Sequence, residues 1–155
     1  MLHLTDSIHF MRSMPSCSVD CIATDPPYRT ISGGKNRAEG YGLANSVVGP
    51  NDGKIFKHND APISEWMPEL YRVLRDGGHC YVMTNVLNLR EMLNEANDAG
   101  FGLHNLLVWK KNTGTPNRWY MKFAEYTLFL RKGPARTINR AGSSNIFEAP
   151  NPRDK

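Results

Sequence analysis

The feature that most constrains this chain is a short apolar run that ends at two consecutive prolines. Residues 19–24 (VDCIAT) are rich in strand-forming side chains, and Asp25-Pro26-Pro27-Tyr28 follows at once. Proline cannot donate a ladder hydrogen bond, so the strand must end before Pro26. The sequence therefore places a carboxylate and a stiff turn at the carboxyl end of a strand, which is where open α/β sheets bind ligands.

The rest of the sequence alternates between helix and strand patterns. Helices are predicted from Asp6 or Ser7 to about Met14, over 64–75 and over 86–99, and strands over 2–4, 79–84, 104–110 and 124–131. Gly77-Gly78 and Gly100 are predicted to stop helices. This alternation indicates a parallel α/β sheet, and the two successive strands at the end favour an antiparallel hairpin. Residues 29–60 are too long for a plain connector, so we expect a mobile, functional loop there.

Composition excludes several protein classes. The 155 residues are enough for one domain, and 40% hydrophobic with 22% charged residues is usual for a folded protein. No apolar run approaches the roughly 18 residues of a membrane span, and no secretion signal is seen, which favours a cytoplasmic protein. Three cysteines without a C-x-x-C pair and five histidines without ligand spacing argue against a disulfide framework and a metal site.

Positive charge is concentrated in one segment. Residues 104–140 carry eight Lys and Arg and one Glu, whereas residues 1–103 carry nine Lys and Arg and twelve Asp and Glu. The basic side chains are Lys110, Lys111, Arg118, Lys122, Arg131, Lys132, Arg136 and Arg140, interleaved with the aromatic residues Trp109, Trp119, Tyr120, Phe123, Tyr126 and Phe129. This combination is typical of a nucleic-acid surface, and an ordinary solvated basic surface is the alternative.

The segment SVDCIATDPPY resembles the catalytic motif of DNA amino-methyltransferases that use S-adenosylmethionine. Three further stretches are similar to later parts of that family: EWMPELYRVLRDGGHCYVMT at 65–84, NLLVWKKNTG at 105–114 and AEYTLFLRKG at 124–133. The ending NIFEAPNPRDK resembles the sequence that precedes the next motif in the permuted beta arrangement. The resemblance covers essentially the whole chain and implies part of a Rossmann-like class I methyltransferase sheet, with parallel strands and an antiparallel last strand.

The resemblance assigns catalysis to Asp25, Pro26, Pro27 and Tyr28. The exocyclic amine of adenine is a poor nucleophile because its lone pair is delocalised into the ring. Asp25 and the carbonyl of Pro26 would accept its two N–H bonds and direct the lone pair at the methyl group of the cofactor. Tyr28 would stack on a base rotated out of the duplex. A packed proline turn with a packed turn aromatic is the structural alternative.

Further positions follow from the same resemblance. Asp6 and Asp25 are expected near the cofactor, although a helix cap explains Asp6 equally well. The candidate contacts to double-stranded DNA are Arg29, Lys35, Arg37, Lys110, Lys111 and Arg118. Residues 133–155 are expected to begin a target-recognition or linker segment. Cys21 and Trp109 are expected in the core, and the absence of a Pro-Cys pair argues against carbon methylation of cytosine.

One family element, the cofactor loop Phe-x-Gly-x-Gly, is not found. None of the glycine-rich spots follows a strand and opens a helix, as such a loop must. We therefore expect an incomplete methyltransferase domain over 1–155 that lacks its cofactor half. Such a fragment would bind S-adenosylmethionine weakly or not at all, and the strand over 19–24 would lie at an open sheet edge. The missing half could come from the same chain or from a second one.

The expected function is methyl transfer to the exocyclic amino group of adenine in DNA, as in phage or restriction–modification enzymes. An aspartate in the first motif position leans the family toward adenine, because the cytosine enzymes more often have serine there. Three alternatives stay open. They are amino methylation of cytosine, a catalytically inactive remnant that binds DNA, and methylation of an amide in protein or of RNA.

Overall fold

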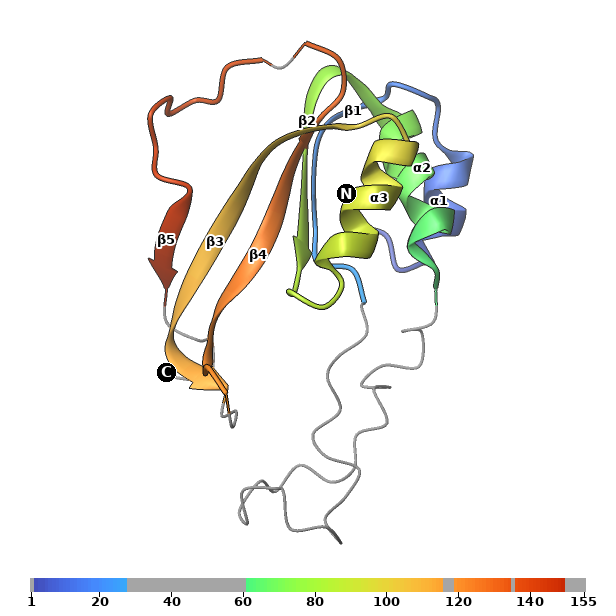
Figure 1. Ribbon diagram of the computed structural model, residues 1–155. Coiled ribbons are helices and arrows are strands. Elements are labelled where there is room, and N and C mark those ends of the chain that lie inside the picture. The colour runs from blue at the N-terminus through green and yellow to red at the C-terminus, as the bar shows by residue number, and fades with distance from the viewer. Residues whose placement is uncertain (1, 28–60, 116–118, 135, 150–155) are drawn as a thin grey trace, which may run out of the picture. The chain divides into compact units, whose positions relative to one another are not determined.

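The computed structural model describes residues 2–27, 61–115, 119–134 and 136–149 (Figure 1). Contacts divide the chain into two units, Met1–Pro26 with Pro62–Lys155, and Pro27–Ala61. All of the helices and strands described below belong to the first unit. The predicted loop over 29–60 lies outside the described residues. None of the described helices is long and apolar enough to cross a membrane.

The described helices and strands form a mixed α/β arrangement. In chain order they are α1 (Ser7–Ser13), β1 (Val19–Thr24), α2 (Ile63–Val73), β2 (Leu74–Thr84), α3 (Leu89–Asp98), β3 (Gly102–Thr115), β4 (Lys122–Arg131) and β5 (Ile146–Ala149). The sheet order is β1-β2-β4-β3-β5. β1 is parallel to β2 and β5 to β3, whereas β4 is antiparallel to both of its neighbours. This agrees with the predicted α/β sheet, in which one strand runs against the others.

The core lies between the helices and one face of the central strands. α2 buries Trp66, Met67, Leu70 and Val73, a spacing that follows one side of a helix, and α3 buries Met92 and Ala96. Alternate residues of the strands meet them, namely Cys80, Val82 and Thr84 of β2 and Leu128 and Leu130 of β4. Figure 1 shows the helices gathered beside β1 and β2, while β3, β4 and β5 extend away from them. The central pair β2–β4 therefore anchors the sheet.

β1 is an edge strand. It pairs with β2 alone in the described sheet, with Ile22 opposite Cys80 and Thr24 opposite Val82. The expectation of an open edge at 19–24 is therefore confirmed for this part of the chain. The expectation that Cys21 belongs to the core is wrong, because Cys21 is exposed and Cys80 is the buried cysteine. A strand at an edge buries only the face that the helices cover, and Cys21 points to the other face.

Two local predictions differ from the structure, and one short strand was not predicted. Residues 2–4 form no strand, and Leu2 and Leu4 are fully exposed because no described strand pairs with them. β2 begins at Leu74, so Gly77-Gly78 lies inside a strand and does not simply stop a helix. The β1–β2 register jumps there, and Gly77 has a φ of +74°, which marks a bulge. β5 was not predicted, because four residues carry too short a pattern.

The prediction for Gly100 is confirmed. Its φ is +100°, and the next amide, that of Phe101, donates to the carbonyl of Ala96 at 2.9 Å. This bond is typical of a helix that ends at a left-handed glycine. A Cβ at Gly100 would lie 3.1 Å from the Tyr71 ring, so the close approach of α3 to α2 also requires a small residue.

Candidate active site

Asp25 stands at the carboxyl end of β1, directly after Thr24. Because β1 and β2 are parallel, this position lies beside the end of β2, where Thr84 is the last residue. β4 begins at the same edge, since it is antiparallel and Tyr126 lies opposite Thr84. Asp25 is exposed and Pro26 is buried. The structure thus holds the turn by its first proline and leaves the carboxylate open to solvent, whereas Tyr28 lies outside the described residues.

At this end of the sheet the pKa of the Asp25 carboxyl is raised. Partial burial raises the pKa of the Asp25 carboxyl above its usual value of 3.8, and the negative charge of Glu125 on β4 raises it further. Glu125 Oε1 in turn accepts a hydrogen bond from Lys111 Nζ at 2.7 Å, and only 11% of the Lys111 side chain is exposed. The edge therefore contains an accessible carboxylate with raised basicity beside a partly buried ion pair.

The sequence did not indicate the Lys111–Glu125 pair. Lys111 is among the predicted contacts to DNA, whereas in the structure its ammonium pairs with Glu125. The pairing depends on the β3–β4 register, in which Trp109 lies opposite Glu125 and Lys110 opposite Ala124. Register is a tertiary property, so the only available signal was one acidic residue among many basic ones.

Lys110 and Trp109 connect β3 to β5. Lys110 Nζ lies 2.7 Å from Glu148 Oε1 in an exposed ion pair, and Trp109 Nε1 donates to the carbonyl of Ala149 at 3.0 Å. Trp109 is half-buried instead of lying fully in the core, because β5 covers only part of it. Of the two DNA candidates that the structure describes, Lys110 and Lys111, Lys110 is the more exposed. Arg29, Lys35, Arg37 and Arg118 lie outside the described residues.

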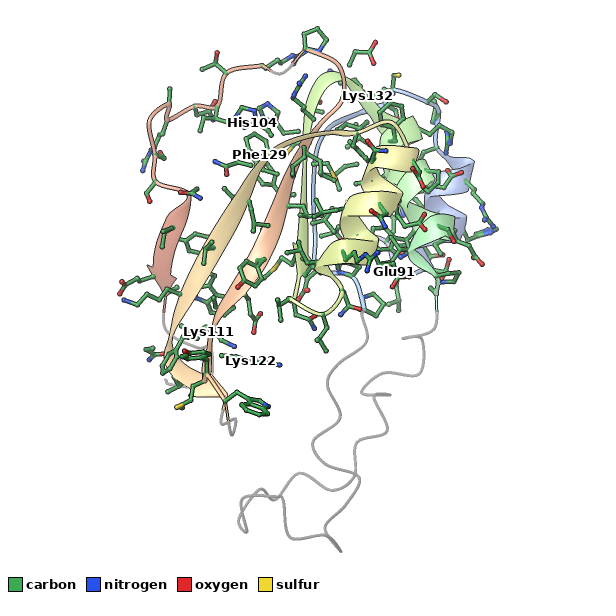
Figure 2. All side chains as sticks on the ribbon, in the orientation of Figure 1. Glu91, His104, Lys111, Lys122, Phe129 and Lys132 are labelled. Atoms are coloured by element: carbon green, nitrogen blue, oxygen red, sulfur yellow. The ribbon has the colours of Figure 1, made fainter. Side chains whose placement is uncertain are left out.

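The basic segment is not one uniform surface. Lys132 is buried, and its Nζ donates to the carbonyls of Tyr71 at 3.0 Å and Leu74 at 2.8 Å. The ammonium also lies 4.6 Å from the centroid of the Tyr71 ring. Figure 2 shows Lys132 at the end of the sheet opposite Lys111 and Lys122. Lys132 therefore belongs neither to a nucleic-acid surface nor to a solvated basic surface, because its ammonium joins the end of β4 to α2 and β2.

Asp6 has a defined structural role. Its carboxylate accepts a hydrogen bond from the amide of His9 at 2.8 Å and so caps α1. The helix-cap interpretation is confirmed, and a position near the cofactor stays a prediction.

The structure describes one buried cysteine, Cys80, and no metal-binding cluster among the described residues. Burial of Cys80, with a smaller effect of Cys21, raises the pKa of its thiol to about 12, so it remains protonated and is a poor nucleophile. Within residues 2–27, 61–115, 119–134 and 136–149, no three His, Cys, Asp or Glu side chains are grouped so that they could hold a metal ion.

The sequence matches the DNA methylase family (N6_N4_Mtase) over residues 19–153, which is most of the chain. The chain belongs to the DNA methylase family. The resemblance seen in the sequence, to DNA amino-methyltransferases, is thereby confirmed. In this DNA methylase chain the matched region includes β1, Asp25 and every later strand.

Two curated relatives support the same family. The chain is 24% identical to the type II methyltransferase M2.DpnII of Streptococcus pneumoniae over 131 residues, which are 83% of this chain and 49% of that protein. It is 28% identical to the type II methyltransferase M.HinfI of Haemophilus influenzae over 116 residues, which are 72% of this chain and 32% of that protein. This DNA methylase chain therefore spans half or less of the length of these relatives.

Solved structures support the fold. The PvuII DNA methyltransferase, which is cytosine-N4-specific, superposes with a TM-score of 0.63 at 13% identity, covering 99% of this chain and 58% of that one. The M1.HpyAVI–SAM complex gives a TM-score of 0.53 at 15% identity, covering 90% and 60%. The predicted class I methyltransferase fold is confirmed by these similarities.

At this end of the sheet the described residues of the DNA methylase chain present carboxylate and backbone carbonyl oxygens. The edge formed by Asp25, Pro26 and Glu125 offers acceptors for an amine. Among the residues that the structure describes, the glycines with positive φ are Gly77, Gly100, Gly133 and Gly142, and none of these four follows a strand and opens a helix. Such a turn is the usual cradle for an adenosyl group, so these residues do not make a complete S-adenosylmethionine site.

Proposed function

We propose that this chain carries the amine-binding part of an S-adenosylmethionine-dependent DNA methyltransferase that modifies the exocyclic amino group of adenine. The observation that carries the proposal is the accessible Asp25 carboxylate at the carboxyl end of β1, in a chain of the DNA methylase family. Type II methyltransferases among the relatives support double-stranded DNA as the substrate. S-adenosylmethionine supplies the methyl group.

Asp25 has two tasks in this proposal. Its carboxylate and the carbonyl of Pro26 each accept an N–H of the target amine, which holds the nitrogen and localises its lone pair. The nitrogen must afterwards lose a proton. A carboxylate whose pKa is raised by burial and by Glu125 accepts that proton more readily than an ordinary aspartate. The 2.7 Å ion pair with Lys111 holds the Glu125 carboxylate in place on β4.

The test is methyl transfer by the gene product that contains these residues, read by mass spectrometry of nucleosides from the DNA of cells that express it. We expect N6-methyladenine, and Asp25→Ala should lower it by about 10²–10³-fold or more. The matched control is Asp20→Ala, which removes an exposed aspartate of the same strand that pairs with Arg75. Wild-type activity in Asp25→Ala would contradict the proposal. N4-methylcytosine would assign the alternative base, and no methylated base would favour an inactive remnant.

Cofactor binding needs a separate measurement on residues 1–155 alone. We propose that the cofactor half comes from other residues, either of the same chain or of a second chain. Calorimetry should accordingly detect no micromolar binding of S-adenosylmethionine by residues 1–155. A clear micromolar titration would contradict this part of the proposal and leave the role of Asp25 untouched.

A further inference from the structure

The turn-side end of the β3–β4 ribbon exposes large apolar side chains. The exposed fractions are 73% for Trp119, 94% for Tyr120, 49% for Met121 and 42% for Phe123. Large apolar groups exposed together on a folded protein usually mark a contact surface. We call residues 119–123 the ribbon tip. It lies just before Glu125, at the sheet edge where Asp25 stands, and Figure 2 shows Lys111 and Lys122 at this end of the ribbon.

The ribbon tip has a packed base. A Cβ added at Gly114 of β3 would lie 2.7 Å from Cε2 of Phe123 and 3.1 Å from Cε of Met121. These two side chains therefore lie over the bare backbone of Gly114, and the strands stay paired below them, with Thr115 opposite Lys122. An aromatic group at the end of a paired ribbon loses less conformational entropy on binding than one on an open loop.

Charge favours nucleic acid over protein as the partner. Residues 104–124 contain four Lys and Arg and no Asp or Glu. Polyanions are bound by positive charge, and aromatic rings stack on bases of any sequence. Proteins that deform a duplex insert apolar or aromatic side chains between base steps, where the unstacking is offset by new contacts. Lys110 and Lys111 of this segment are paired with Glu148 and Glu125, so the ribbon tip itself contributes the cation of Lys122 beside its exposed rings.

We propose that the ribbon tip is a wedge that enters the DNA base stack and fills the space left by the nucleotide that rotates toward Asp25. Tyr120, the most exposed of the four side chains, is the leading group, and Trp119 stacks beside it. This inference rests on the proposed function, because a gap in the stack arises only if a base is extruded. The wedge stabilises the extruded state by restoring stacking, and it is a positioning element that takes no part in methyl transfer.

The experiment compares two duplexes of about two helical turns that differ only in one abasic site. The abasic site presents the gap without the cost of extruding a base, so the wild-type chain should bind that duplex about tenfold more tightly, the value of stacking one ring. Tyr120→Ala and Trp119→Ala should lose this preference, and Tyr120→Phe should keep it. The matched control is Leu103→Ala, because Leu103 is a 52% exposed apolar residue at the opposite end of β3.

Tryptophan fluorescence gives a second readout. Trp66 is buried and Trp109 is half-buried with its Nε1 bonded to Ala149, so Trp119 is the tryptophan most accessible to DNA. The abasic duplex should quench the emission and protect it from acrylamide, and Trp119→Phe should remove most of that change.

The outcomes separate the wedge from the proposed function. If the wild-type chain binds the two duplexes equally, or if the preference survives in Tyr120→Ala and Trp119→Ala, the wedge is refuted while DNA binding stands. If the wild-type chain binds neither duplex at low salt, the wedge and the DNA substrate both fail. Self-association without DNA that Tyr120→Ala abolishes would assign the ribbon tip to a protein contact and overturn the wedge.

Discussion

The two ends of the β3–β4 ribbon come from one basic, aromatic-rich segment and have opposite environments. At one end Lys132 is buried and its ammonium joins two backbone carbonyls and the Tyr71 ring. At the other end Trp119 and Tyr120 are exposed. The difference teaches that charge and aromatic content alone do not identify a binding surface. Burial distinguishes Lys132 from Trp119 and Tyr120, and it decides whether a side chain stabilises the fold or lies at the surface.

The largest expected effect is at the buried end. Lys132→Met keeps an apolar stem of similar length and removes the ammonium, which leaves the carbonyls of Tyr71 and Leu74 without this donor. We expect the free energy of unfolding to fall by about 3 kcal/mol, since each bond to a charged group contributes about 1.5–3 kcal/mol. Urea unfolding measures this. The control is Arg140→Met, at an exposed position of the same segment. If Lys132→Met and Arg140→Met lowered the free energy of unfolding equally, burial would not explain the difference between the two ends of the ribbon.

A pair of glycines, one near each end, tests packing in the same way. A Cβ at Gly78 would lie 2.7 Å from Cδ1 of Leu74 and 2.8 Å from the carbonyl oxygen of Arg75, and the backbone cannot yield. We expect Gly78→Ala to lower the free energy of unfolding by about 2 kcal/mol. At Gly114 the nearest atoms are the outer atoms of the Phe123 and Met121 side chains, which can rotate away. Gly114→Ala should therefore change the free energy of unfolding by less than about 1 kcal/mol.

DNA affinity should separate these two glycine variants in the opposite order. Gly114→Ala displaces the base of the ribbon tip and should weaken binding of the abasic duplex, whereas folded Gly78→Ala should bind it normally. Thermal unfolding and fluorescence anisotropy on the same samples provide both values. A ribbon tip that tolerates Gly114→Ala in both measurements would mean that Phe123 does not need its present position.

Those parts of the fold that have strong local patterns could be predicted from the sequence. The apolar run 19–24, the helix face of Trp66, Leu70 and Val73, and the strand over 124–131 carry their periodicity in neighbouring residues. The sequence did not predict β5 or the early start of β2. β5 has only four residues and β2 passes through Gly77-Gly78, so both strands depend on pairing partners distant in the chain. Tertiary pairing decided these cases.

The candidate site shows the same division. The position of Asp25 after β1 follows from the two prolines, which must end the strand. Other features could not be predicted from the sequence, because each depends on which face of the sheet a residue occupies and which strand lies beside it. They are the burial of Lys132, the exposure of Cys21 and the contact between Lys111 and Glu125. A lysine has the same pattern in sequence whether it reaches water or a buried carbonyl.

The smallest effects concern two adjacent lysines of β3 that differ in exposure. The Lys110–Glu148 pair is more than half exposed on both sides, and such pairs contribute about 0–1 kcal/mol, so Lys110→Met should change the free energy of unfolding by less than about 0.5 kcal/mol. Lys111→Met leaves the partly buried Glu125 carboxylate without its cation and should cost about 1.5 kcal/mol. Double-mutant cycles with Glu148→Gln and Glu125→Gln isolate the two pair energies.

The pKa of Asp25, measured by carboxyl NMR, provides a second comparison of Lys110 with Lys111. Glu125 already raises the pKa of Asp25, and without the Lys111 cation its negative charge is less compensated. The pKa of Asp25 should therefore rise further in Lys111→Met, fall toward 3.8 in Glu125→Gln, and stay unchanged in Lys110→Met.

The raised pKa of Asp25 also makes stability depend on pH, because the native protein binds more protons there than the unfolded chain does. The contribution of Asp25 to stability then decreases as the pH rises above 3.8, most strongly in Lys111→Met. If the pKa of Asp25 is the same in Lys111→Met as in the wild type, the Lys111–Glu125 pair contributes to the fold alone.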